Sequence, residues 1–146
     1  MVRAKPKKSK FPADKARVKK IISKLNRAHP DAKLDLDFSN PLELLIALIL
    51  AAQARDDLVN QVTAQLFLKY RTPQDYAHAS LASLEGEIRR INFFRNKARL
   101  IQNCCREVVE RFQGKIPNDL DDLLSLPGVG RKTANILLGN AFGRQA

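Results

Sequence analysis

The chain has 146 residues, of which 45% are hydrophobic and 28% charged, and this composition excludes a disordered protein and fits one globular domain. The formal net charge is +11, and five positive charges lie in the first ten residues, which contain no acid. The other 136 residues keep a charge of +6, so we expect the folded part to be basic by itself and to bind a polyanion such as nucleic acid. We expect residues 1–12 to form a flexible basic tail.

The longest apolar run, Leu44–Ala52, has nine residues, whereas a membrane-spanning helix needs about 20, so no membrane protein is expected. The two cysteines, Cys104 and Cys105, are adjacent, which excludes a disulfide framework and is typical of a reducing compartment. We therefore expect a cytoplasmic protein. We also expect one thiol to be packed in a helix and the other to lie at its edge, with no metal site.

The hydrophobic pattern predicts helices along the whole chain. An amphipathic helix is expected over residues 13–28, ending before Pro30. Asn40 is expected to cap the next helix, which has Pro41 at its first position and is apolar on every side over residues 41–54. A helix that is apolar all round belongs in the middle of a bundle.

Later helix boundaries follow from capping residues, prolines and glycines. The expected start signals are Asp56, Thr72 with Pro73, Ser80 and Asn118. A long helix over residues 94–112 is expected to stop at Gly114. The last helix is expected over residues 131–141. No alternating β-branched run predicts a strand. Short helices with frequent turns are typical of an all-α orthogonal bundle, here one that ends in a helix–hairpin–helix.

A tight turn, Pro127–Gly130, separates a short acidic helix from the last helix and folds the two into the hairpin. Gly128 and Gly130 can adopt backbone angles that are closed to other residues, and Val129 is expected to anchor the turn in the core. Backbone N–H groups at the start of the last helix then form an anion site. Because two basic residues follow directly, the sequence favours a DNA phosphate as the ligand over a plain corner between helices.

Lys132 lies in the first turn of this last helix, beside Arg131. A neutral amine at this position can attack C1′ of a bound sugar and form a Schiff base. From these physical arguments alone, a second cation that contacts phosphate is favoured over a nucleophile.

Three segments carry a family resemblance. "LPGVGRKTANILLGNAFG" (126–143) resembles the helix–hairpin–helix of the endonuclease III family of DNA glycosylases. "LILAAQARD" (48–56) resembles that family's L-x-x-Q-x-x-D helix end, and "INFFRNKARLI" (91–101) resembles its G-[FL]-[YF]-x-x-K-A segment. The resemblance runs in order from residue 13 to residue 143. We therefore expect residues 13–146 to be a helix–hairpin–helix DNA glycosylase domain that is incomplete at its C-terminal end.

The resemblance also implies roles for single residues. Lys132 takes the position of the Schiff-base nucleophile, Gln53 that of the residue that fills the gap left by a flipped base, and Phe93 that of an apolar wedge in the opposite strand. The hairpin residues implied to hold the DNA backbone are Gly128, Val129, Gly130 and Arg131. From the residues alone, Gln53 as a polar helix end and Phe93 as core packing stay open.

The implied function is base excision repair, in which a glycosylase removes a damaged base and nicks the abasic strand by β-elimination. The family's adenine-specific branch carries a glutamate near the position of Leu48 and lacks the lysine, so the branch that acts on oxidised pyrimidines is favoured. The implied partner is double-stranded DNA with a damaged base or an abasic site, bound by a monomer. The alternative is a non-catalytic helix–hairpin–helix DNA-binding module.

The 146 residues depart from the family pattern in three ways. The V-D-T-H segment, whose aspartate is the family's essential carboxylate, and the four cysteines of a [4Fe–4S] cluster are expected beyond Ala146. We therefore expect no cofactor in this chain and impaired glycosylase activity, because a carboxylate steadies the positive charge that develops on the sugar. Asn92 also stands where the family usually has glycine.

Overall fold

The computed structural model describes residues 34–143, and these residues form seven helices and no strand. The helices are α2 (Pro41–Ala51), α3 (Asp56–Lys69), α4 (Pro73–His78), α5 (Leu81–Glu87), α6 (Phe94–Phe112), α7 (Leu120–Leu124) and α8 (Arg131–Asn140). The all-α prediction is confirmed. None of these seven helices combines the length and the apolar character that crossing a membrane requires. The predicted helix over residues 13–28 and the basic tail lie outside the described residues.

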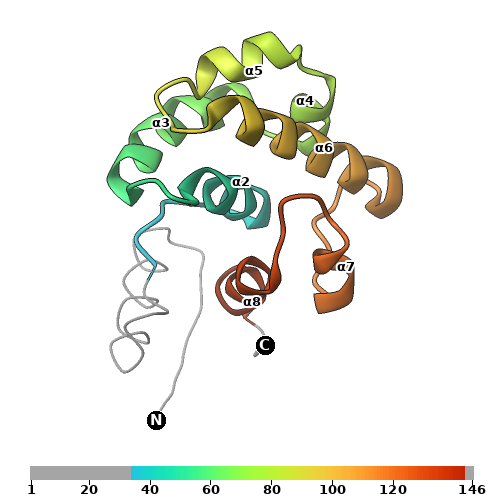
Figure 1. The fold of residues 1–146 in the computed structure, drawn as a ribbon. Coiled ribbons are helices and arrows are strands. Elements are labelled where there is room, and N and C mark those ends of the chain that lie inside the picture. Colours follow the sequence, from blue (N-terminus) through green and yellow to red (C-terminus); the bar gives the residue numbers. More distant parts are fainter. Residues whose placement is uncertain (1–33, 144–146) are drawn as a thin grey trace.

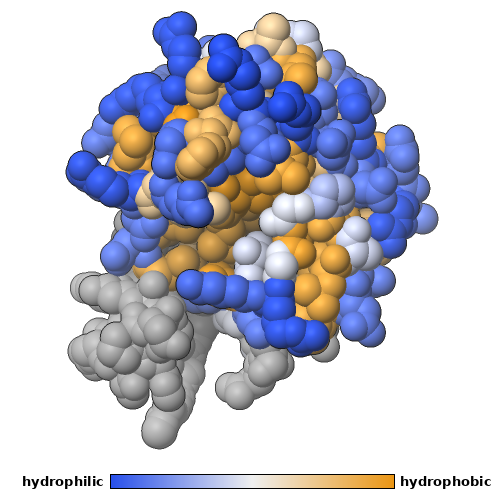
Figure 2. All heavy atoms as spheres, in the orientation of Figure 1, coloured by the Kyte–Doolittle hydropathy of each residue, from blue (hydrophilic) through white to orange (hydrophobic). Residues whose placement is uncertain are grey.

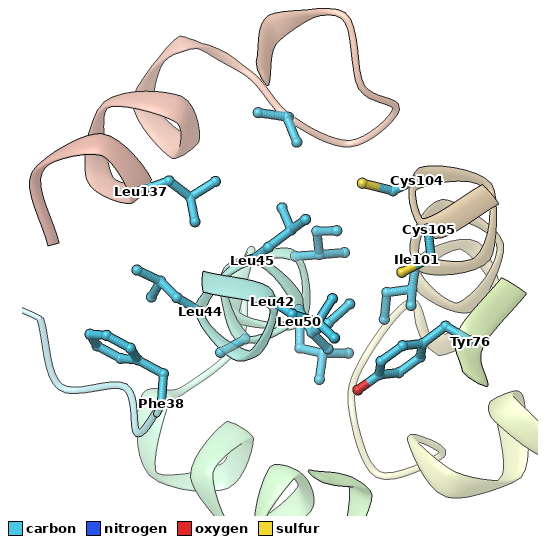
Figure 3. Packing of buried hydrophobic residues seen from close by; sticks show 14 of the residues in the cluster. Phe38, Leu42, Leu44, Leu45, Leu50, Tyr76, Ile101, Cys104, Cys105 and Leu137 are labelled. Atoms are coloured by element: carbon cyan, nitrogen blue, oxygen red, sulfur yellow. The ribbon is translucent and has the colours of Figure 1, made fainter. Parts of the chain in front are cut away.

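The apolar helix α2 lies at the centre of the fold. Asn40 fixes its first turn, because the Asn40 side-chain oxygen accepts a hydrogen bond from the Glu43 amide at 2.9 Å and Pro41 is the first helical residue. Most residues of α2 are buried. Figure 3 shows its leucines surrounded by side chains from α4, α6 and α8. The central position expected from the sequence is confirmed.

The other helices surround α2 in two groups. In Figure 1, α3, α4, α5 and α6 arch over one side of α2, and the pair of α7 and α8 lies on the other side. Helix α2 contacts α3, α6 and α8, whereas α4 and α5 pack on α6 and α7 packs on α8. The bundle therefore ends in the predicted helix–hairpin–helix, and its two groups meet along α2.

Several helix boundaries match the predicted capping residues. Thr72 and Asp75 form a reciprocal capping box at the start of α4, and the Ser80 hydroxyl accepts a backbone N–H bond at 3.0 Å at the start of α5. Helix α6 spans the predicted residues. It ends because Gln113 and Gly114 both adopt left-handed backbone angles.

Two predicted caps are wrong by one residue. Helix α3 begins at Asp56 itself, and Arg55 occupies its N-cap position without a side-chain capping bond. Helix α7 is capped by Asp119, whose carboxylate accepts a hydrogen bond from the Asp122 amide at 3.1 Å, and not by Asn118. Carboxylates are favourable anywhere in the first turn of a helix, where they face the positive end of its dipole, so an aspartate near a helix start does not by itself mark the cap.

Both cysteines of α6 are buried, which corrects the expectation that one thiol lies at the helix edge. Burial raises the pKa of the Cys104 thiol to about 12 and also raises the pKa of Cys105. Helix α6 contacts α2, α4 and α5, so two consecutive positions both face packed neighbours. Figure 3 shows the two side chains among the other core residues.

The described residues carry no net charge as a set. Residues 34–143 contain 13 basic and 13 acidic residues, so the excess of positive charge comes from residues 1–33 and Arg144. The charge of +6 expected outside the first ten residues thus belongs to residues 11–33 and Arg144, and not to residues 34–143. Their charges are unevenly placed, because acidic residues gather at the start of α7 whereas two basic residues open α8.

Candidate nucleic-acid interface

A cleft of about 350 Å³ lies where the end of α2, the start of α6 and the hairpin turn meet. Besides hydrophobic residues of α2 and α6, its lining includes Gln53, Phe93, Asn96, Lys97, Gly128 and Thr133. Three residues predicted to contact DNA, from three separate segments, thus border one cleft. In Figure 2, hydrophobic surface is gathered in a hollow over α2, and hydrophilic residues surround it.

Gln53 lies in a sharp turn just after α2, which ends at Ala51, before the predicted end at residue 54. Its backbone φ is +56°, in the left-handed region that residues with a side chain seldom adopt. The Ala54 amide donates a hydrogen bond to the Ala51 carbonyl at 3.0 Å and closes the turn. Gln53 is therefore a polar residue at a helix end, and the turn also makes it part of the cleft lining.

Lys97 holds the end of α2 in place from α6. Its Nζ atom donates hydrogen bonds to the Leu50 carbonyl at 2.8 Å and to the Ala52 carbonyl at 2.6 Å. The side chain is buried, and this burial lowers the pKa of the Lys97 amine. Because both bonds tie the amine to the backbone, Lys97 serves as an anchor for the turn rather than as a nucleophile.

Sequence reasoning missed the part that Lys97 plays. The residue stands in the segment "INFFRNKARLI", between apolar positions of an amphipathic helix, and a lysine on that face is a signal for a paired, buried amine. Its partners are carbonyl groups more than forty residues away, which no local pattern identifies.

Phe93 immediately precedes α6 and is 61% exposed, so the interpretation of this residue as core packing is wrong. Ile91, two residues earlier in the same loop, is fully buried and attaches the loop to the core. The φ angle of Phe93 is +59°, again in the left-handed region. Among residues 34–143, Leu68 is the only other large hydrophobic residue that is exposed to this degree.

The hairpin turn places its three middle residues in different environments. Gly128 has a φ of +82°, which requires glycine, whereas Gly130 has φ −95° and ψ −177°, an extended conformation open to any residue. The predicted conformational need for glycine is therefore right at Gly128 and wrong at Gly130. Val129 is buried and anchors the turn as predicted. A Cβ atom added at Gly130 meets nothing within 4 Å, so this glycine leaves free space in front of α8.

Lys132 and Arg131 are both exposed in the first turn of α8. Lys132 is not among the residues that line the cleft, although its neighbour Thr133 is. Gly130, the N-cap residue, has no side chain, so the first-turn N–H groups of α8 lack a side-chain cap from this position. The start of α8 thus presents uncapped N–H groups and two cations together.

In the part of the chain that the structure describes, no acidic side chain lines this cleft. The same residues contain no group of three or more histidine, cysteine or acidic side chains that could hold a metal ion. A [4Fe–4S] cluster is held by four cysteines. The chain has two cysteines, both buried on α6, so its residues do not fit such a cluster.

The family model described as "HhH-GPD superfamily base excision DNA repair protein" matches residues 46–141. The chain belongs to this superfamily. The matched range contains every residue that lines the cleft, from Leu48 to Thr133.

Endonuclease III proteins are relatives of the chain. It is 45% identical over 122 residues to endonuclease III of Bacillus subtilis (strain 168) and 40% identical over 130 residues to that of Escherichia coli (strain K12). The matches cover 84% and 89% of this chain but 56% and 62% of the two relatives, so the chain spans about three-fifths of their length. The resemblance to the endonuclease III family is confirmed.

Solved structures show the same fold. A trapped covalent intermediate of endonuclease III with DNA and a non-covalent endonuclease III–DNA complex each match with a TM-score of 0.75 and 47% identity, over 90% of this chain and 62% of theirs. A thermostable thymine-DNA glycosylase matches with a TM-score of 0.73 and 25% identity, over 78% of this chain and 54% of its own. The described bundle with its helix–hairpin–helix thus has the same fold as these proteins over the part that they share.

Proposed function

We propose that this chain acts on duplex DNA as an endonuclease III-type glycosylase and abasic-site lyase. The observation that carries the proposal is the shared cleft. Gln53, Phe93 and the hairpin turn border one hollow, and Lys132 stands in the first turn of the helix that follows. The likeness to an endonuclease III that was trapped covalently on DNA supports the same partner here.

The start of α8 is proposed to bind the DNA backbone. Its first-turn N–H groups have no side-chain cap, and the positive end of the helix dipole lies at the same place. The free space in front of Gly130 lets a phosphate approach the backbone closely. Arg131 adds a charge-assisted contact. These contacts hold the duplex in position and read no base sequence.

Gln53 and Phe93 are proposed to enter the duplex when a nucleotide is flipped out. Extrusion of a base loses a few kcal/mol of stacking and pairing, and side chains that fill the gap restore part of this energy. Both residues are exposed, come from different segments and border the same cleft, as two inserting side chains require.

Lys132 is proposed as the nucleophile of the lyase step. The neutral amine adds to the C1′ aldehyde carbon of an abasic site and water leaves, which gives a Schiff base. The Schiff base takes up a proton from water, and the positively charged imine then draws electrons from the sugar. A water molecule accepts the proton that leaves C2′, and the C3′–O bond breaks with the 3′ phosphate as leaving group. Lys97 does not compete, because the backbone carbonyls of Leu50 and Ala52 hold its amine.

The preferred lesion is proposed to be an oxidised pyrimidine. The position at which the adenine-specific branch carries a glutamate is Leu48, a half-buried apolar residue that lines the cleft. Because the described cleft lining contains no carboxylate, we also propose that these 146 residues nick preformed abasic sites faster than they excise a damaged base.

Borohydride trapping on a duplex with one abasic site tests the proposal. Wild-type chain should form a covalent adduct, and Lys132→Ala should lose it by at least about a hundredfold, because Lys132 is the only lysine within the segment from α7 to α8, residues 120–140. Lys115→Ala, which changes an exposed lysine outside the cleft lining, is the matched control and should trap like wild type. Equal, poor trapping by wild type and Lys132→Ala overturns the catalytic proposal.

The lack of an acidic residue in the described cleft favours one second candidate, a DNA-binding module without catalysis. Such a module binds duplex DNA in a salt-sensitive manner, and Lys132→Ala weakens its binding only modestly. A preference for abasic-site duplex that disappears in Lys132→Ala counts against this candidate.

A further inference from the structure

The two residues proposed to enter the duplex lie in loops that are joined to each other. The Asn92 side chain donates a hydrogen bond from Nδ2 to the Gln53 carbonyl at 2.7 Å. Asn92 immediately precedes Phe93, so one bond connects the turn after α2 with the loop before α6.

Both loops need support, because both depend on an unfavourable backbone conformation. Gln53 and Phe93 have φ angles of +56° and +59°, in the left-handed region where a residue with a side chain is strained. Such strain persists only where the surrounding structure fixes it, and it is common at functional sites.

The peptide planes on either side of Gln53 are both held from the segment around Phe93. Lys97 binds the carbonyl of Ala52, which belongs to the plane before Gln53, and Asn92 binds the carbonyl of Gln53 itself, which belongs to the plane after it. Rotation about φ moves one plane relative to the Gln53 Cα atom, and rotation about ψ moves the other. The two bonds therefore fix both backbone angles of Gln53.

We propose that Asn92 is a positioning residue that makes Gln53 and Phe93 a single preformed unit for insertion into the duplex. This inference rests on the proposed function. Its energetic basis is preorganisation, since a loop already held in its bound conformation loses less conformational freedom on binding. Lys97 is buried and supports the fold as well. Asn92 is exposed, and within residues 34–143 its side chain bonds to the Gln53 carbonyl, so Asn92 is the residue that separates positioning from stability. A glycine at this position has no side chain to make the bond.

The test measures binding to two duplexes, one with a tetrahydrofuran analogue of an abasic site and one without damage. Asn92→Ala should lose about tenfold in affinity for the analogue duplex and less than twofold for the undamaged duplex. Asn103→Ala, which changes an exposed asparagine within α6, is the matched control and should bind both duplexes like wild type. A 2-aminopurine base opposite the analogue should show a smaller fluorescence increase with Asn92→Ala than with wild type.

A double-variant comparison separates positioning from a direct DNA contact. If Asn92 acts through Gln53, the Gln53→Ala/Asn92→Ala variant binds the analogue duplex as weakly as Gln53→Ala alone. Losses that multiply, or an Asn92→Ala variant that keeps wild-type selectivity, overturn the proposal. Failure of the proposed function gives a different result, because wild-type chain then shows no preference for the analogue duplex. Asn92→Gly, which removes the same side chain, should repeat the Asn92→Ala result.

Discussion

The hairpin turn and the two loops across the cleft use the same left-handed backbone conformation with different residues. In the turn the residue is Gly128, which adopts φ +82° without strain, whereas in the loops the residues are Gln53 and Phe93. The turn is proposed to act through backbone N–H groups and needs no side chain at its bend. The loops are proposed to act through the side chain of the bent residue itself, so glycine cannot replace it. Hydrogen bonds from neighbouring residues must then stabilise the strained backbone.

The largest expected effect comes from breaking the support of the loops. Lys97→Met keeps the length of the side chain but leaves the Leu50 and Ala52 carbonyls without their charged partner. We expect the free energy of unfolding to fall by about 3 kcal/mol in urea denaturation. Lys115→Met, at an exposed position, should stay within about 0.5 kcal/mol of wild type. A Lys97→Met variant as stable as this control means that water replaces both bonds.

A smaller effect is expected from the bend of the hairpin. Gly128→Ala should lower the free energy of unfolding by about 1–2 kcal/mol, because alanine is strained at φ +82°. The added Cβ meets Leu100 only at an ordinary 3.5 Å, so the backbone angle is the cause. Gly130→Ala, in extended backbone with free space around it, should change stability by less than about 0.5 kcal/mol. Equal losses at the two glycines contradict this account of the turn.

The strain in the loops can be measured at Gln53. Gln53→Gly and Gln53→Ala both remove the side chain, but only glycine relieves the left-handed backbone. We expect Gln53→Gly to be the more stable of the two by about 0.5–1 kcal/mol, after the greater freedom of glycine in the unfolded chain is included. Both variants should lose selectivity for abasic-site duplex to the same extent. If Gln53→Ala is the more stable variant, the loop carries no strain at this residue.

The smallest expected effect concerns the uncapped start of α8. Gly130→Ser places a capping hydroxyl at a residue whose extended backbone already suits an N-cap, so the free energy of unfolding should rise by a few tenths of a kcal/mol. The hydroxyl then occupies N–H groups that are proposed to bind phosphate, and affinity for duplex DNA should fall severalfold at fixed salt. Gly130→Ala adds similar bulk without the cap and shows how much of the loss is steric.

Local signals in the sequence were enough to predict most of the fold. Asn40 with Pro41, and Thr72 with Pro73, mark helix starts because each cap acts on N–H groups two or three residues away. The apolar surface of α2 identifies the central helix, because it is read from consecutive residues of one segment. Asn118 was a wrong prediction because the next residue, Asp119, is an equally good cap and only the packed structure selects between them.

The site was harder to predict, because its parts meet only in three dimensions. The resemblance identified Gln53, Phe93 and the hairpin, and the structure brings them to one cleft. The bonds from Asn92 and Lys97 to the end of α2 span about forty residues or more, so no local pattern contains them. The total charge of the chain also gives no indication that basic and acidic residues balance within residues 34–143.

The burial of the two cysteines has a practical consequence for labelling the protein. Thiol reagents such as maleimide react with the thiolate, and burial raises the pKa of both thiols far above neutral pH. The folded wild-type chain should therefore resist maleimide labelling at pH 7. Leu68→Cys, at a side chain that is 63% exposed, should take up one fluorophore or spin label without removal of either native cysteine. Because Cys104 and Cys105 do not react, a single introduced cysteine allows site-specific spectroscopy of the protein with and without bound DNA.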